Sequence, residues 1–373
     1  MIDKEWAKET LAKIDKKITA EAERMAGIIP YVPNDKGRYE DFGKKDIAWW
    51  TNGFWGGMLW QLYQVTGKEV YRTRAQELED RMDQAIVEFD GLYHDVGFMW
   101  MHMSVANYRL TGNVKSKSRG MHMATLLAGR YNPLGHYIRA WNEDKAGWII
   151  IDCLMNLPLL YWASEENGDP RFRAIAEEHA HTAMKIIQRE DGSCNHIAIL
   201  DPMNGKLVDY PAGQGYASGS SWSRGQSWAV YGFALSYLHT GNKEYLDAAI
   251  KTADYFVECV EKTDYLPLCD FRQPAEPVYY DATAGAIASC GLLEISKHVD
   301  GELKEKYENA AMNIMKAMCE NWCDFDENND GFLTMGKVAY SYGFNDVHDK
   351  IVYGDYFFTE AVLRMMDKHM MIW

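Results

Sequence analysis

The chain has 373 residues, of which 47% are hydrophobic and 13% aromatic, so it can build a large core. Its formal net charge of −15 argues against a broad nucleic-acid surface, which needs clustered Lys and Arg. There is no basic segment followed by an apolar one at the N-terminus, and Asp152 and Pro158 interrupt the most apolar run. We therefore expect no signal peptide and no membrane span.

The seven cysteines lack CxxC spacing, and an odd number without a signal peptide predicts reduced thiols and a cytoplasmic protein. The chain contains no GxGxxG, Walker or GxSxG motif, and we predict neither a cofactor nor a metal.

Glycine turns divide the chain into repeated units of two helices. Each turn follows an aromatic-rich segment with few charges and precedes an amphipathic segment that carries Lys, Arg and Glu on one face. Their spacing is quasi-regular, as in repeated supersecondary units. We expect the first helix of each unit to be buried and the second to be peripheral. The turn glycines are Gly67, Gly112, Gly168, Gly241 and Gly301.

The two kinds of helix alternate along the chain, and strand-like alternation is scarce. The buried, inner helices are expected to begin near Asn52, Val96, Trp148, Arg224, Asp281 and Gly354. The peripheral, outer helices are expected to begin near Asp3, Lys68, Asn113, Asp169, Asn242 and Glu302. Six of each kind, with no linker of disordered composition between them, predict one all-α domain over residues 1–373, an (α/α)6 barrel. An open helical solenoid is the alternative; an outer helix first and an inner helix last favour closure.

Long segments before the inner helices predict where a site lies. Residues 27–51, 190–223 and 262–280 are rich in Gly, Pro, Asp and aromatic residues. Loops of this length in a compact domain are usually functional. Because each precedes an inner helix, we expect them on one rim of the ring, where helix N-termini favour an anionic ligand.

Asp152 is a candidate acid because it follows three isoleucines, residues 149–151. A carboxylate in that setting is desolvated unless it faces a cavity. Desolvation raises its pKa, which suits a general acid near neutral pH. The alternative is a buried Asp that caps a backbone group or pairs with an arginine.

Other polar residues at the expected rim have more than one interpretation. Asp95 begins an inner helix, where aspartate is usually an N-cap, and His94 is either a hydrogen-bond donor or a packed ring. Arg224 lies between Trp222 and Trp228 at a helix start. That position suits a clamp for a carboxylate, and a structural salt bridge is the alternative.

Six stretches together resemble the unsaturated glucuronyl hydrolases, glycoside hydrolase family 88. They run in the family's order from about residue 45 to about residue 365. The stretches are WTNGFWGG at 50–57, HDVGF at 94–98, IIIDCLMNLPLL at 149–160, GSSWSRGQSWA at 219–229, GLLEI at 291–295 and YGDYF at 353–357.

The resemblance implies an (α/α)6 barrel that acts on oligosaccharides whose terminal uronate carries a C4=C5 double bond left by a polysaccharide lyase. It implies that Asp152 is catalytic and that Asp95 is a second essential carboxylate, which binds sugar hydroxyls. Asp152 would protonate C4 and then, as a carboxylate, activate water for attack at C5, after which the hemiketal opens and releases the aglycone. The substrate-binding residues implied are Trp50, His94, Trp141, His196, Gln214, Trp222, Arg224 and Trp228.

Alternatives remain for the substrate and for the reaction. Family members that read sulfated substrates carry a Ser-and-Lys cluster before the last inner helix, whereas residues 345–350 here offer Lys350 without the serines. An unsaturated rhamnogalacturonyl hydrolase would share the fold and act on pectin fragments. A sugar epimerase would use a histidine pair such as His94 and His196. A non-catalytic binding module would need no acid.

Overall fold

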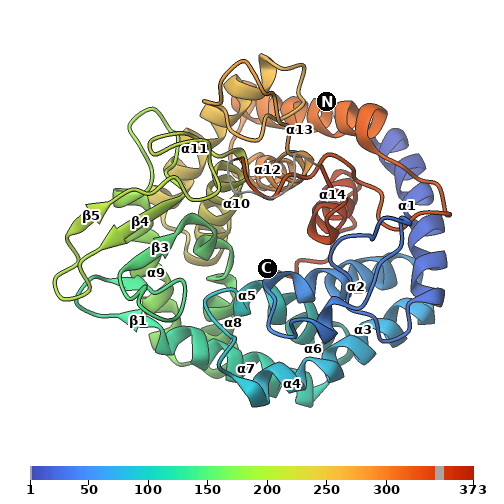
Figure 1. Ribbon diagram of the computed structural model, residues 1–373, viewed down its shortest axis with the longest axis horizontal. Helices are drawn as coiled ribbons and strands as arrows, with labels where there is room; N and C mark the ends of the chain where they lie inside the picture. Colours follow the sequence, from blue (N-terminus) through green and yellow to red (C-terminus); the bar gives the residue numbers. More distant parts are fainter. Residues whose placement is uncertain (1, 341–347) are drawn as a thin grey trace.

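The helices form two concentric rings (Figure 1) in the computed structural model, which describes residues 2–340 and 348–373. The inner helices are α2 (Phe54–Thr66), α5 (Val96–Trp100) with its continuation α6 (Ala106–Thr111), α8 (Pro158–Asn167), α10 (Ser223–Thr240), α12 (Ala282–Ile295) and α14 (Val352–Met365). A π-helical turn (Met101–Val105) joins α5 to α6. The outer helices are α1 (Lys4–Arg24), α3 (Glu69–Arg81), α7 (Val114–Gly129), α9 (Pro170–Ile186), α11 (Lys243–Glu261) and α13 (Gly301–Trp322).

The ring closes where its first and last helices meet, because α14 packs against α1 and α2 as well as α12. This confirms the predicted (α/α)6 barrel in place of an open solenoid. A short helix, α4 (Asp83–Glu88), and the 3-10 turns Phe42–Lys44 and Trp50–Gly53 lie in the connections.

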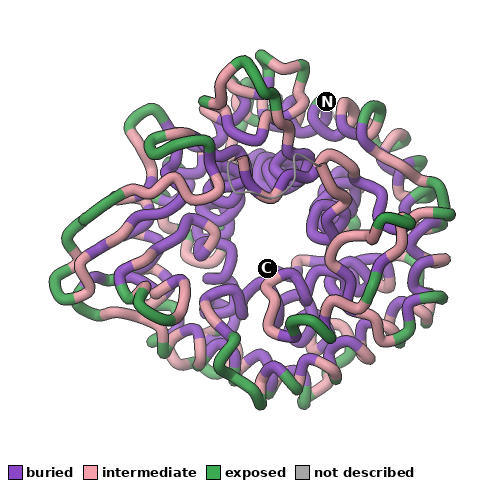
Figure 2. The backbone as a smooth tube through the Cα atoms, viewed as in Figure 1, coloured by how far each residue is buried: buried purple, intermediate pink, exposed green. Residues whose placement is uncertain are grey.

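Burial separates the two rings as the sequence predicts. Every residue of α12 and α14 is buried, whereas α11 and α13 bury one face and expose the other. Figure 2 shows the buried backbone around the inner ring and the exposed residues mainly at the periphery and in the loops. Burial of the inner helices on most sides explains why they carry few charges, since a buried charge needs a partner.

Four of the turn glycines end inner helices as expected. Gly67, Gly112, Gly168 and Gly241 adopt the left-handed conformation and donate their N–H to the carbonyl four residues earlier. Gly301 differs: α12 ends at Ile295, and Gly301, at φ 58°, is the first residue of α13.

The third inner helix begins later than the sequence predicts. Trp148–Ile150 form a strand, β3, which pairs antiparallel with β4 (Ile197–Leu200); β4 pairs with β5 (Leu207–Asp209). β-Branched isoleucines favour the strand, and Pro158 is well placed at the first turn of α8. A 3-10 turn (Ile151–Met155) connects β3 to α8 and carries Asp152. A second pair of short strands is β1 (Tyr131–Asn132) with β2 (Tyr137–Ile138).

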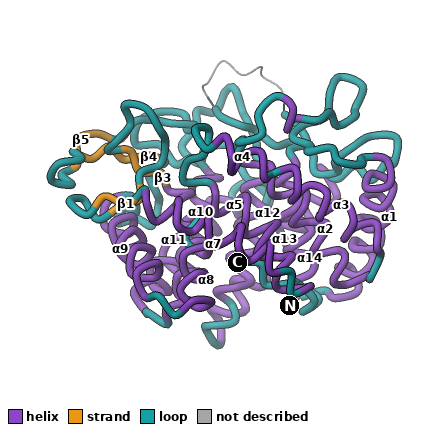
Figure 3. The backbone as a smooth tube through the Cα atoms, turned by 90° about the horizontal axis from the view of Figure 1, so that it is seen from below, coloured by secondary structure: helices purple, strands orange, loops and turns teal. Residues whose placement is uncertain are grey.

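The strands and most of the long loops gather at one end of the ring (Figure 3), which is the rim expected from the sequence. Among the described residues, no helix combines the length and the apolar character needed to cross a membrane.

Candidate active site

A cavity of about 290 Å³ lies where the loops before the inner helices meet. The predicted residues that line it are Trp50, Asp95, Trp141, Asp152, His196, Gln214, Trp222, Arg224 and Trp228. The structure thus brings together residues that lie up to 178 positions apart, from Trp50 to Trp228. His94 does not line the cavity and is fully buried beside it.

Two carboxylates and one imidazole form the polar centre of the site. The 3-10 turn holds Asp152, whose side chain is 20% exposed toward the cavity. Asp95 precedes α5 and makes no side-chain cap, contrary to the N-cap interpretation. His94 Nε2 lies 3.5 Å from Asp95 Oδ2 and 3.8 Å from Asp152 Oδ1. A ligating atom of each residue lies within 4.8 Å of the others.

Burial controls the protonation of this centre. Desolvation raises the pKa of Asp152 to about 7 and, together with the neighbouring charge of Asp152, raises the pKa of Asp95 well above its usual value. Two carboxylates this close do not ionise together readily, so the pair retains a proton at neutral pH. Desolvation also lowers the pKa of His94 strongly, so its ring is neutral. These three residues could reach one cation, but a carboxyl that holds a proton is a poor ligand, and we interpret the cluster as a proton-transfer site.

Asn156 connects Asp95 to the first turn of α5, and the sequence analysis did not identify it. Its Nδ2 donates to Asp95 Oδ1 at 3.1 Å, and its Oδ1 accepts from the Phe98 N–H at 2.7 Å. The amide donor favours the ionised form of Asp95. Asp152 Oδ1 has no hydrogen-bond partner, although backbone N–H groups at residues 152 and 153 favour the ionised form of this carboxyl. Asn156 lies in the 149–160 stretch that resembles family 88, and that resemblance could have identified it as a site residue.

His196 and Gln214 form another part of the cavity lining. The Gln214 N–H donates to His196 Nδ1 at 2.9 Å, and Gln214 Nε2 donates to the Val338 carbonyl. Desolvation lowers the pKa of His196 to about 3, so this ring is also neutral. The His196 ring lies 4.3 Å from that of Trp222, centroid to centroid.

Arg224 is held by the protein's own carboxylate. Its Nη1 lies 2.6 Å from Asp281 Oδ2, and the two Nη atoms also donate to the Lys337 and Val338 carbonyls. The guanidinium lies over the Trp222 ring at 4.5 Å, as the aromatic frame in the sequence suggests. The salt bridge considered as the alternative is thus present, and Arg224 also lines the cavity.

Aromatic side chains that the sequence analysis did not select complete the lining: Tyr31, Trp49, Tyr93 and Tyr353. Tyr93 directly precedes His94, and Tyr353 lies at the start of α14. Their positions in the sequence could have identified both tyrosines as site residues. Of the stretch compared with a sulfate-binding cluster, residues 345–347 lie outside the described residues. Lys350 binds Asp324, with 2.7 Å between Nζ and Oδ2.

The chain is similar to known proteins over most of its length. The family model for glycosyl hydrolase family 88 matches residues 22–372. The chain is 34% identical to the unsaturated glucuronyl hydrolase of Bacillus sp. (strain GL1), covering 90% of each chain. It is 32% identical to the unsaturated chondroitin disaccharide hydrolase of Streptococcus pneumoniae, covering 88% of this chain and 84% of that one.

Solved structures agree with the sequence matches. The crystal structure of the Bacillus sp. GL1 enzyme, described as responsible for the degradation of glycosaminoglycan, superposes with a TM-score of 0.89 at 32% identity over 96% of both chains. That of unsaturated glucuronyl hydrolase from Streptococcus agalactiae gives 0.92 at 27% identity, over 100% of this chain and 95% of the other. The match along the sequence and the closed ring with its carboxylate pair lead to one conclusion: the chain belongs to glycosyl hydrolase family 88.

Proposed function

We propose that the chain removes the terminal 4,5-unsaturated uronic acid from lyase-generated glycosaminoglycan oligosaccharides. The observation that carries the proposal is the carboxyl of Asp152. It faces an aromatic-lined cavity, has a pKa of about 7, and has one oxygen without a hydrogen-bond partner. A carboxyl in that state can give a proton to a substrate atom and afterwards take one back.

In the proposed reaction Asp152 donates its proton to C4 of the vinyl ether, and the ring oxygen stabilises the cation that develops at C5. The Asp152 carboxylate then takes a proton from water as the water oxygen bonds to C5. The resulting hemiketal opens to a ketone at C5 and a hemiacetal at C1, which releases the aglycone alcohol. One water is consumed and Asp152 regains its proton, so no second acid is required.

The other residues are assigned to binding. Ionised Asp95 accepts hydrogen bonds from sugar hydroxyls, and neutral His94 supports it from behind the cavity wall. His196 and Gln214 offer polar contacts. The remaining predicted residues provide apolar surface for the sugar rings and, through Arg224, positive charge near the uronate: Trp50, Trp141, Trp222, Arg224 and Trp228.

The epimerase alternative fits less well. His94 and His196 are both held neutral by burial, and His196 Nδ1 already accepts the Gln214 N–H. The carboxyl of Asp152 titrates nearer to neutral pH than either imidazole.

Lyase digests of chondroitin, hyaluronan, heparin and pectin test the proposal. We expect the near-ultraviolet band of the conjugated double bond to disappear with the glycosaminoglycan digests, and saturated disaccharides to remain intact. Consumption of the pectin digest alone would identify a rhamnogalacturonyl hydrolase. An unchanged band with all four digests would contradict both assignments.

Isotope and sulfur substitutions test the mechanism. In heavy water the product should carry one deuterium on a single face of C4 at early times. A thio-linked substrate should still be processed, because the bridging atom is never protonated by the enzyme. An inert thio-linked substrate together with no deuterium at C4 would refute hydration and require a conventional pair of carboxylates.

We also propose a cytoplasmic location. The support is chemical: the seven cysteines are unpaired, and those at the core, such as Cys153 and Cys290, are buried.

A further inference from the structure

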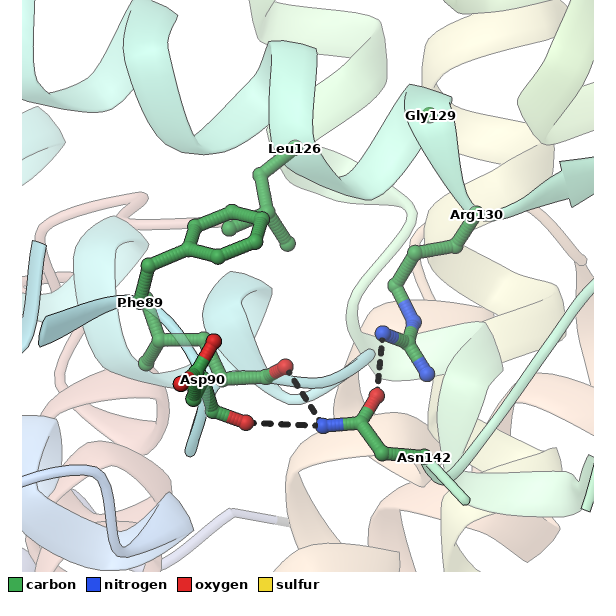
Figure 4. A pocket seen from close by; sticks show the side chains of 7 residues that line it. Phe89, Asp90, Leu126, Gly129, Arg130 and Asn142 are labelled. Atoms are coloured by element: carbon green, nitrogen blue, oxygen red, sulfur yellow. Dashed lines mark hydrogen bonds between the residues drawn. The ribbon is translucent and has the colours of Figure 1, made fainter. Parts of the chain in front are cut away.

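A second cavity, of about 530 Å³, lies on the outer side of the loops that form the active site. Figure 4 shows that Arg130, which follows the last turn of α7, points along its wall toward Asn142. Phe89 and Leu126 lie on the other side of the opening. Nothing in the proposed reaction uses these residues, yet Arg130 is connected to two segments that form the active site.

The guanidinium of Arg130 binds the segment that carries Trp141. Nε donates to the Arg139 carbonyl at 2.9 Å. Nη2 donates to the carbonyls of Ala140 at 2.9 Å and Trp141 at 3.0 Å, and Nη1 donates to Asn142 Oδ1 at 2.8 Å. One planar side chain thus fixes four consecutive residues, and a lysine cannot reproduce this fork.

The same network reaches the segment that carries Asp95. Asn142 Nδ2 donates to the carbonyls of Asp90 and Leu92, each at 3.1 Å. The Ala140 carbonyl, which accepts from Arg130, also accepts from the His94 N–H at 3.2 Å. Arg130 is therefore the common anchor for Trp141 and for the turn that presents Asp95.

Arg130 is also a cation without an ion pair, because no salt bridge among residues 2–340 and 348–373 includes it. Its four acceptors are neutral carbonyl and amide oxygens, so its charge is not cancelled locally. The charge acts on Asp95, whose ionised form it favours. The other titratable and charged groups around Asp95 and Arg130 are Asp152, Cys153, Tyr93, His94, Arg139, His179 and Arg224.

We propose that Arg130 is a positioning residue, which holds Trp141 in register with the His94–Asp95 turn and places an unpaired positive charge beside that turn. The proposal rests on the proposed function, which assigns the proton-donating role to Asp152. It distinguishes two effects, geometry and charge, and two substitutions separate them.

Arg130→Lys keeps the charge and loses the fork. We expect KM for the unsaturated disaccharide to rise roughly tenfold, equivalent to one lost contact with a sugar ring, because Trp141 is no longer fixed. The pH profile of kcat/KM should keep its position, since the cation remains.

Arg130→Gln removes the charge as well. Loss of a cation raises both macroscopic pKa values of the carboxylate pair. Both limbs of a bell-shaped pH profile of kcat/KM should therefore move to higher pH, on the order of 1 unit. Arg139→Gln removes a neighbouring charge whose side chain donates to the Glu143 carbonyl. In that control the pH profile of kcat/KM should keep its position.

Asn142→Ala tests the connection independently of Arg130. It should raise KM as Arg130→Lys does, and the double variant should add little to either single change, because both break one network. Leu126→Ala alters the lining of the second cavity and leaves the Arg130 guanidinium in place. It should leave KM and the pH profile of kcat/KM unchanged.

The outcomes decide the role of Arg130 separately from the function. Arg130 variants that have a lower Tm but keep the wild-type KM and the wild-type pH profile of kcat/KM would show that Arg130 is only structural. That result would overturn the inference. If Arg130→Gln does not fold, an unchanged KM in both Arg130→Lys and Asn142→Ala overturns it equally. A wild-type protein that ignores every lyase digest would contradict the proposed function instead.

Discussion

At the scale of single residues, the raised pKa of Asp152 sets the expected pH dependence of activity. A general acid must be protonated, and a pKa of about 7 means that Asp152 loses its proton as the pH rises through neutrality. We therefore expect kcat/KM to fall on the alkaline side of about pH 7. A profile that is flat from pH 6 to about pH 9 would contradict this assignment.

Asp152→Asn tests the same group by removing its proton while keeping its size. We expect a loss of kcat of roughly 10²- to 10⁴-fold, measured as disappearance of the ultraviolet band. Asp144→Asn, which changes an exposed carboxylate in the nearby 142–147 segment, is the matched control and should keep its turnover. A loss of only a few-fold in an intact Asp152→Asn protein would remove Asp152 from the mechanism.

The same substitution should change stability in a pH-dependent way. The folded state binds the Asp152 proton more tightly than the unfolded state, whose carboxyl titrates near 3.8. The free energy of unfolding therefore decreases as pH rises from about 4 to about 7, and the cost persists above that range. Asp152→Asn has no such cost. Its Tm relative to wild type should be higher at about pH 8 than at about pH 4, and an equal difference at both would show that the burial cost is absent.

At the scale of elements, the pair of Arg224 and Asp281 joins the starts of α10 and α12. Both side chains are buried, and Asp281 also caps α12 by accepting from the Thr283 N–H. Removing one partner leaves the other charge buried without its counter-ion, which costs about 3–5 kcal/mol. We expect Arg224→Met to lower the free energy of unfolding by that amount in denaturant titrations.

The double variant Arg224→Met with Asp281→Asn provides the control for that experiment. Because it removes both charges, its loss of stability should be smaller than the sum of the two single losses. Additive losses would mean that the two side chains do not depend on each other. Arg224 would then be free to clamp the substrate carboxylate, as the sequence analysis considered.

The elements also show what the sequence could and could not predict. Helical periodicity and αL glycines determine where α2, α10 and their outer partners lie, because these signals are local. The strand at Trp148–Ile150 was missed because a short apolar run does not distinguish a strand from a buried helix. Its partner β4 lies about fifty residues later in the chain. The bonds of Asn156 and Arg130 were not predicted either, because each joins segments that only the closed ring brings together.

At the scale of the whole molecule, the two ends of the ring have different roles. The loops, the cavity and the carboxylate pair lie at one end, whereas the last residues of the chain run into the centre of the ring (Figure 1), below those loops (Figure 3). There Trp373 stacks on Phe357 and donates its indole N–H to Glu360 at 3.0 Å. The loops thus carry residues that line the cavity, while the C-terminal residues fill the centre of the ring beneath it. That the whole chain folds as one domain stays a prediction.

Two tryptophan substitutions test this division. Trp373→Ala removes a fully buried ring and leaves Glu360 without one of its donors, so it should lower the free energy of unfolding by about 3–5 kcal/mol. Its KM should stay unchanged where the protein is folded, because the cavity does not include Trp373. Trp141→Ala removes a half-buried ring from the cavity wall and should do the opposite, raising KM roughly tenfold with little change in Tm. Denaturant titration and steady-state kinetics on the same preparations measure both quantities. A rise of KM in folded Trp373→Ala would show that the packing at the ring centre affects the cavity. The ring centre and the cavity would then have to be treated as one coupled unit.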